Sequence, residues 1–124
     1  ESSPDITGAI SVATVTTAHS LEAKAIVTVT KTGKTARMIS KYRPHCSIIG
    51  CSPSPMICRQ MNMSWGVTPV LCDEKTNTDE LFAHAVERAE EQNLLQSGDK
   101  IIITAGIPLG ISGTTNMLKV TTIE

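Results

Sequence analysis

The stretch that decides the fold is the apolar run Ala25-Ile26-Val27-Thr28-Val29, which leads directly into the polar segment Thr30-Lys31-Thr32-Gly33-Lys34-Thr35. A second apolar run at residues 100–104 is followed in the same way by a glycine-containing segment, residues 105–116. In an open α/β sheet, ligands bind where loops leave the carboxyl ends of the strands. If these two runs are neighbouring strands, we expect their loops to close around one small site.

Composition restricts the class of protein. The chain has 124 residues, of which 40% are apolar and 19% charged, and these values are typical of one globular domain covering residues 1–124. The formal net charge of −1 gives no general field for a nucleic acid. No apolar run approaches the roughly 18 residues of a membrane span, and no signal peptide is visible. We therefore expect a cytoplasmic protein with neither a nucleic acid nor a membrane as partner, and the start at Glu1 suggests an excised piece.

Strand-like and helix-like segments alternate along the chain. Proline, glycine and the spacing of apolar residues predict helices at residues 6–18, 33–42 and 53–66 and from Thr78 onward, and strands at residues 25–29, 47–51, 67–71, 100–104 and 117–123. This alternation predicts an α/β fold, a three-layer open sheet with helices on both faces.

The strand order follows from two further rules. Pro69 cannot donate to a central ladder, so the third strand should lie at an edge. Right-handed crossovers then give the order 3-2-1-4-5, with strands one and four adjacent at the centre. The last strand should run antiparallel, because the connection from strand four is too short for a helical crossover.

The segment at residues 30–35 has the chemistry of a phosphate site. It opens a helix, where backbone N–H groups and the helix dipole favour an anion, and its threonines and lysines add donors and charge. It is not a Walker P-loop, because the glycine spacing differs. The alternatives are a plain turn for this segment and a plain connection for residues 106–116. From both segments, the predicted phosphate-binding residues are Thr30, Lys31, Thr32, Gly33, Lys34, Thr35, Gly110, Ser112, Gly113 and Thr114.

The remaining reactive side chains do not form a convincing catalytic or metal site. The cysteine spacings match no zinc pattern, and we expect reduced, partly buried thiols, with a disulfide or a metal site as the alternative, at Cys46, Cys51, Cys58 and Cys72. We expect surface positions for the histidines His19, His45 and His84. Trp65 is expected to pack beneath the third strand, the alternative being a ligand-stacking role. We predict no catalytic residue and no metal ligand.

Five short motifs, in this order and spacing, resemble the C-terminal domain of the pyruvate kinases, particularly the bacterial enzymes. The resemblance covers nearly the whole chain and rests on Thr30-Lys31-Thr32-Gly33-Lys34-Thr35-Ala36, Lys41-Tyr42-Arg43-Pro44, Gly66-Val67-Thr68-Pro69-Val70-Leu71, Gly98-Asp99 and Ser112-Gly113-Thr114-Thr115-Asn116.

The resemblance implies a division of labour within a longer enzyme. In that family a separate barrel, absent from this chain, transfers a phosphoryl group from phosphoenolpyruvate to ADP with Mg²⁺ and K⁺. The C-terminal domain binds the allosteric effector and helps to build a tetramer. It therefore implies a domain that is inactive alone and binds no cofactor itself. The family's effector phosphate loop corresponds to residues 30–35, and its closing loop to residues 106–115.

Two departures from the family pattern bear on the effector. The region around residues 75–78 is short, and Leu81 stands where an arginine grips the second phosphate of fructose 1,6-bisphosphate in some relatives. The resemblance therefore implies a sugar monophosphate or AMP, with the bisphosphate less expected. The strand from Met117 to Ile123 is the candidate for pairing with a second copy of the chain. The alternatives are a stand-alone phosphate- or nucleotide-binding module and a purely structural oligomerisation domain.

Overall fold

The computed structural model describes residues 6–30, 33–73, 78–105 and 117–123 of the chain. In chain order its elements are α1 (Ile6–Leu21), β1 (Ala25–Val29), α2 (Lys34–Lys41), β2 (Ser47–Ser52), α3 (Pro55–Met61), β3 (Val67–Leu71), α4 (Thr78–Glu91), β4 (Lys100–Ala105) and β5 (Met117–Thr122).

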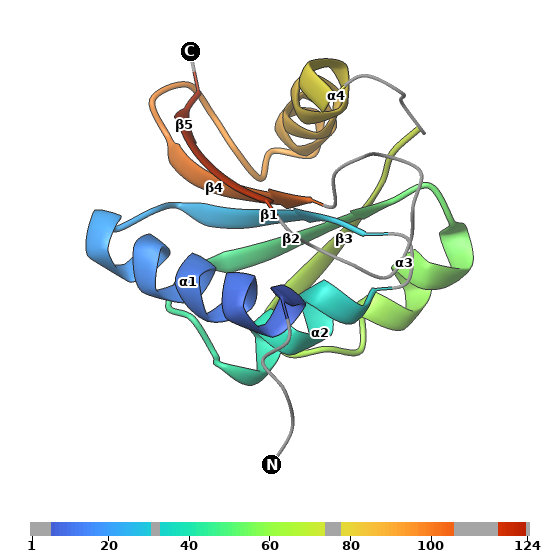
Figure 1. Cartoon of the computed structure of the whole chain (residues 1–124). Helices are drawn as coiled ribbons and strands as arrows, with labels where there is room; N and C mark the ends of the chain where they lie inside the picture. The colour runs from blue at the N-terminus through green and yellow to red at the C-terminus, as the bar shows by residue number, and fades with distance from the viewer. Residues whose placement is uncertain (1–5, 31–32, 74–77, 106–116, 124) are drawn as a thin grey trace.

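The five strands form one sheet in the order β3-β2-β1-β4-β5, which confirms the predicted topology (Figure 1). Strand β1 runs parallel to β2 and β4, β2 runs parallel to β3, and β5 runs antiparallel to β4. Pro69 lies on the edge strand β3, as its missing N–H requires. The central strands β1 and β4 are paired from Ala25↔Ile101 to Thr28↔Thr104.

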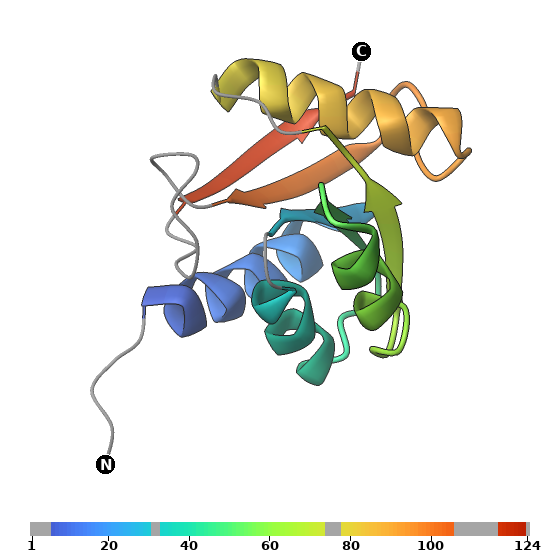
Figure 2. The same cartoon turned by 90° about the vertical axis from the view of Figure 1, so that its right-hand side faces the viewer.

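Helices cover both faces of the sheet. Helix α4 lies alone on one face, and α1, α2 and α3 lie together on the other (Figures 1 and 2). Successive strand residues point to opposite faces. Val27 therefore packs in the cluster under α4, while its neighbour Ile26 packs in the cluster under the three other helices. Burial on both faces explains why β1 is an almost continuous apolar run.

Three boundaries and one packing prediction differ from the sequence analysis. Helix α1 continues past residue 18 to Leu21 and ends at Glu22, whose backbone is left-handed with a φ of 54°. Helix α3 begins at Pro55, with Ser54 as its cap, and ends at Met61, well before Gly66. The prediction that Trp65 packs beneath the third strand is wrong: its side chain is half exposed and the Arg43 guanidinium lies over its ring, 5.1 Å from the centroid. Among the described residues, no helix is both long and apolar enough to cross a bilayer.

Candidate functional site

The carboxyl ends of β1 and β4 lie side by side, as the candidate site requires. Thr28 and Thr104 are partners in the parallel register, and the chain leaves β1 at Thr30 and β4 at Ala105. Four of the predicted phosphate-binding residues are described: Thr30, Gly33, Lys34 and Thr35. The other six lie outside the described residues, namely Lys31, Thr32, Gly110, Ser112, Gly113 and Thr114.

Thr30 fixes the start of the phosphate-loop segment through two hydrogen bonds. Its backbone N–H donates to the carbonyl oxygen of Cys51 on β2 over 2.9 Å, and its Oγ1 accepts from the backbone N–H of Gly33 over 2.9 Å. A threonine hydroxyl that accepts one bond retains its own O–H as a donor. The side chain can therefore hold the turn and still donate to a phosphate oxygen.

Gly33 caps helix α2 without a side chain. Its φ of 81° is left-handed, and its carbonyl oxygen accepts the backbone N–H of Arg37 over 3.0 Å. The first turn of α2 contains no acidic residue. An added Cβ at Gly33 would lie 3.1 Å from an Arg37 guanidinium nitrogen and 3.2 Å from Cγ of Met61. The positive φ and these close contacts together favour glycine at this position.

Arg37 is a basic residue of the site that the sequence prediction missed. It is exposed, and its guanidinium reaches back beside Gly33 at the amino end of α2. The helix dipole places partial positive charge at the amino end, so a second positive charge there is repelled. An anion bound between the helix end and the guanidinium would interact favourably with both. The signal was present in the sequence: Arg37 follows Gly33 by four residues, which places the two on the same side of a helix.

The two helix residues from the predicted set differ in exposure. Lys34 is exposed and contributes positive charge at the first position of α2. Thr35 is buried at 4% exposure and packs inward. Lys34 therefore lies at the surface of the site, whereas the Thr35 side chain lies in the interior.

The start of α3 lies against the same turn. Ser54 caps α3 by accepting the backbone N–H of Ile57 over 3.3 Å, and its own N–H donates to Oγ of Ser52 over 3.2 Å. Ile57 and Met61 both approach the bare face of Gly33. These contacts attach the phosphate-loop segment to the carboxyl end of β2 as well as to β1.

The cysteines and histidines were predicted in part correctly. All four cysteines are free, two buried and two half-buried, as predicted. Burial raises the pKa of the Cys46 and Cys58 thiols. His19 and His45 are exposed, but the surface prediction is wrong for His84, whose side chain is only 15% exposed. Its Nε2 accepts the backbone N–H of Asp73 over 3.0 Å, which fastens the end of β3 to α4.

Two further features bear on the class of ligand that the site can bind. Leu81 is buried in the core under α4, so that position offers no charge to a second phosphate. Within the described ranges, no three His, Cys, Asp or Glu side chains gather as a metal-ligand set. The described geometry suits one small anion held by backbone N–H groups, a hydroxyl and basic side chains.

The sequence has clear relatives. Residues 8–121 match the family described as the alpha/beta domain of pyruvate kinase. The chain is 49% identical over 115 residues to a pyruvate kinase of Clostridium acetobutylicum, covering 93% of this chain and 24% of that protein. It is also 49% identical over 115 residues to a pyruvate kinase of Staphylococcus epidermidis, covering 93% of this chain and 20% of the relative.

A solved structure has the same fold. The crystal structure of a pyruvate kinase from Cryptosporidium parvum superposes with a TM-score of 0.87 at 31% identity, covering 100% of this chain and 24% of that one. The chain therefore spans between a fifth and a quarter of the length of the relatives that it matches.

Proposed function

Because this chain belongs to the family of the pyruvate kinase alpha/beta domain, we propose that it is the effector-binding and oligomerisation domain of a pyruvate kinase. The whole enzyme would transfer a phosphoryl group from phosphoenolpyruvate to ADP, giving pyruvate and ATP in the cytoplasm. That reaction, with its Mg²⁺ and K⁺, would take place in the part of the enzyme that the longer relatives have in addition. This chain alone would not catalyse it.

The effector would be a phosphate monoester, either a sugar monophosphate or AMP. The observation that carries this proposal is the amino end of α2, where the Thr30 hydroxyl and the Arg37 guanidinium both lie beside the Gly33 turn. The buried Leu81 supports one phosphate rather than two, because it leaves that position without a cation.

Regulation would be a shift between two arrangements of the whole enzyme. An effector can change the activity only by its difference in affinity for the two arrangements. The chain leaves β1 and β4 beside each other, so one ligand could contact both segments at once. Closure of residues 106–116 over a bound phosphate would supply the difference in affinity.

Strand β5 would contribute to oligomerisation. It is an edge strand, paired only with β4 in the described sheet, and Lys119 and Val120 on it are exposed. An open edge can pair with its copy across a two-fold axis and continue the sheet between subunits.

Titration calorimetry tests the effector proposal. This chain is titrated with ribose 5-phosphate, AMP and fructose 1,6-bisphosphate, first as wild type and then as Lys31→Ala. The control is Lys24→Ala, which removes an exposed lysine just before β1, at the opposite end of the strand. We expect a monophosphate to bind to wild type and to the control, and more weakly to Lys31→Ala.

The other candidates predict different results. A purely structural oligomerisation domain would bind none of the three ligands. A stand-alone binding module would bind one, but the gene would encode no barrel upstream of this segment. If wild type and Lys31→Ala bound the monophosphate equally well, the segment at residues 30–35 would not be part of the binding site.

A further inference from the structure

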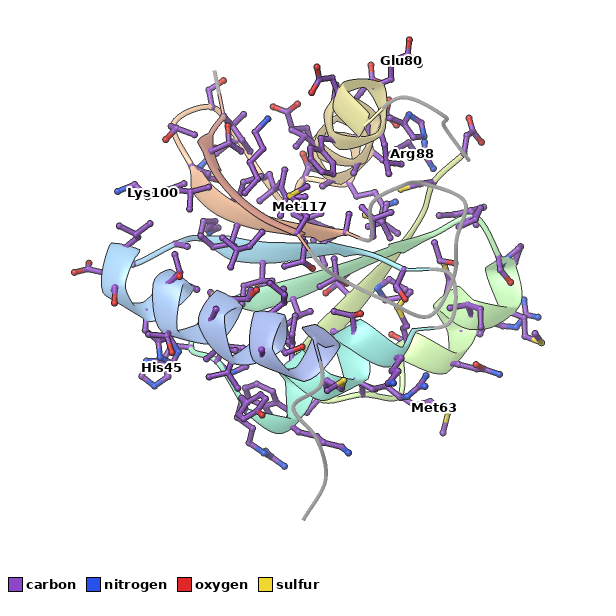
Figure 3. All side chains as sticks on the ribbon, viewed as in Figure 1. His45, Met63, Glu80, Arg88, Lys100 and Met117 are labelled. Atoms are coloured by element: carbon purple, nitrogen blue, oxygen red, sulfur yellow. The ribbon has the colours of Figure 1, made fainter. Side chains whose placement is uncertain are left out.

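Two side chains of α4, one helical turn apart, hold the end of β3. His84 precedes Arg88 by four residues, so both lie on the same side of the helix. The Nε2 atom of His84 accepts the backbone N–H of Asp73 over 3.0 Å, and Nε of Arg88 donates to the Leu71 carbonyl oxygen over 3.1 Å. Figure 3 shows the Arg88 side chain extending from α4 toward the end of β3. These two bonds fasten the chain to the helix on either side of Cys72.

The two attachments respond differently to pH. An arginine guanidinium stays charged and remains a donor throughout the pH range in which proteins are folded. Histidine is the side chain that ordinarily changes its charge between about pH 5 and pH 8. A ring nitrogen that accepts a hydrogen bond carries no proton, so the Asp73 N–H is held by the uncharged ring of His84 with its proton on Nδ1. When the ring takes up a second proton, Nε2 becomes a donor and this bond is lost.

The protonated ring has carboxylate partners at the same place. Oδ2 of Asp73 lies 4.0 Å from Nε2 of His84, and Oε1 of Glu87 lies 4.0 Å from Nδ1. A hydrogen bond between a charged donor and a carboxylate is shorter and stronger than one between neutral groups. The charged ring can therefore exchange the backbone N–H of Asp73 for the carboxylate of the same residue.

Other charged groups surround the ring as well. The titratable and charged groups at this contact come from α4 and from the end of β3, and they are Glu80, Glu87, Arg88, Glu91, Cys72 and Asp73. Glu74 and Lys75 follow in the sequence and lie outside the described residues. Nη1 of Arg88 lies 2.8 Å from Oε1 of Glu91, so the positive charge nearest to His84 along the helix is itself paired with a carboxylate.

We propose that His84 is a pH-sensitive latch between α4 and the end of β3. In its uncharged form the ring holds the backbone N–H of Asp73. On acidification the charged ring releases that N–H and donates from Nε2 to the Asp73 carboxylate instead.

The rearrangement should begin at Asp73 and leave the strand before it in place. The backbone N–H of Cys72 donates to the Ser52 carbonyl oxygen of β2 over 3.0 Å, and neither this bond nor the one from Arg88 to Leu71 involves the imidazole. The strands β1, β2, β3 and β4 are parallel, so their carboxyl ends share one edge of the sheet. The latch therefore acts at the edge that carries the candidate effector site.

Nuclear magnetic resonance of the ¹⁵N-labelled wild-type chain tests the latch between about pH 8 and pH 5. One spectrum follows the protonation of the His84 ring nitrogens. A second experiment measures the protection of backbone amides from hydrogen exchange, relative to the intrinsic rate at each pH. We expect the Asp73 amide to lose its protection several-fold on acidification, with the same midpoint as the ring. The Cys72 amide should keep its protection throughout.

The variant His84→Gln separates protonation from the hydrogen bond itself. The side-chain oxygen of glutamine can accept the Asp73 N–H but does not titrate, so the Asp73 amide should be equally protected at both ends of the pH range. His45→Gln is the matched control, because it replaces an exposed histidine just before β2, at the opposite edge of the sheet. This control should keep the wild-type pH dependence.

The variant Asp73→Asn tests the second partner of the ring. The midpoint of the His84 ring titration should move to lower pH, because the charged ring loses a carboxylate neighbour. The shift should be small, since the Asp73 side chain is 83% exposed and water screens the attraction. Asp79→Asn, which removes an exposed carboxylate from the first turn of α4, is the control for net charge and should move the midpoint less.

The proposal fails if the ring takes up no proton in this range, or if it does so while the Asp73 amide stays equally protected in wild type. A pH-dependent Asp73 amide in His84→Gln would also overturn it. Equal shifts of the ring midpoint in the two asparagine variants would overturn the exchange of partners on Asp73.

Discussion

The Oγ1 of Thr30 accepts a hydrogen bond from the backbone N–H of Gly33 over 2.9 Å, and this bond is buried. It closes the turn between the central strand β1 and helix α2. The Thr30 hydroxyl therefore helps to orient the amino end of α2.

Replacing Thr30 by valine should destabilise the chain by about 1–3 kcal/mol, because the buried Gly33 N–H loses its acceptor. Urea unfolding measures this change. Thr30→Ser retains the hydroxyl and should recover most of the loss. Equal losses for the two variants would mean that the methyl group, rather than the hydrogen bond, stabilises the turn.

Gly33→Ala should cost more stability than Gly66→Ala. Both glycines have a positive φ, 81° and 72°, so an alanine pays about 1–2 kcal/mol of backbone strain at either position. An added Cβ at Gly33 also meets Arg37 and Met61 at 3.1 and 3.2 Å, whereas at Gly66 nothing lies within 4 Å. Thermal unfolding of both variants compares the two costs. A larger loss at Gly66 would contradict the packing around Gly33.

Arg37→Ala should weaken binding of a phosphate monoester about tenfold or more, because a hydrogen bond to a charged group contributes about 1.5–3 kcal/mol. Calorimetry of the chain measures the affinity. Arg59→Ala, which removes an exposed arginine from α3, is the matched control for net charge and should bind like wild type. Equal weakening by both variants would point to a general charge effect.

Thr28→Val and Thr104→Val should each stabilise the chain by about 1 kcal/mol. The two residues are register partners on β1 and β4, and in the described structure neither buried hydroxyl has a hydrogen-bond partner. Valine has the same shape without the unsatisfied group. Thr14→Val is the comparison variant, because the Thr14 hydroxyl donates a hydrogen bond to the Ile10 carbonyl oxygen over 2.7 Å. This substitution should not stabilise the chain. Denaturant unfolding measures the stability of the three variants. A loss of stability in both strand variants would show that the Thr28 and Thr104 hydroxyls do have hydrogen-bond partners.

The stability of the reduced chain should fall as the pH rises above about 9. The pKa of Cys51 is raised above its ordinary value of 9.0 by its hydrogen bond to Cys72 and by burial. The folded chain therefore keeps a proton that the unfolded chain releases, and this contribution is complete below pH 9 and declines above it. Urea unfolding at pH 7.5 and pH 10 measures the decline, which should be smaller in Cys51→Val. An equal decline in that variant would assign the effect to other groups.

Much of the fold could be predicted because each rule needed only local sequence. Pro69 placed β3 at an edge, and the short connection before Met117 required an antiparallel last strand. Trp65 could not be placed in this way. Whether an aromatic ring is buried depends on which distant surfaces pack against it, and here the Trp65 ring stays half exposed with the Arg43 guanidinium over it.

The sequence by itself determined the order of the strands and the chemistry of the segment after β1, because hydrophobic periodicity, proline and glycine act over a few residues. Only the tertiary structure decided which distant groups meet. The Arg37 guanidinium lies beside Gly33, and the His84 side chain accepts the backbone N–H of Asp73. Such contacts depend on strand register, helix orientation and packing between segments far apart in the chain. Those three features are fixed only when the helices pack against the complete sheet.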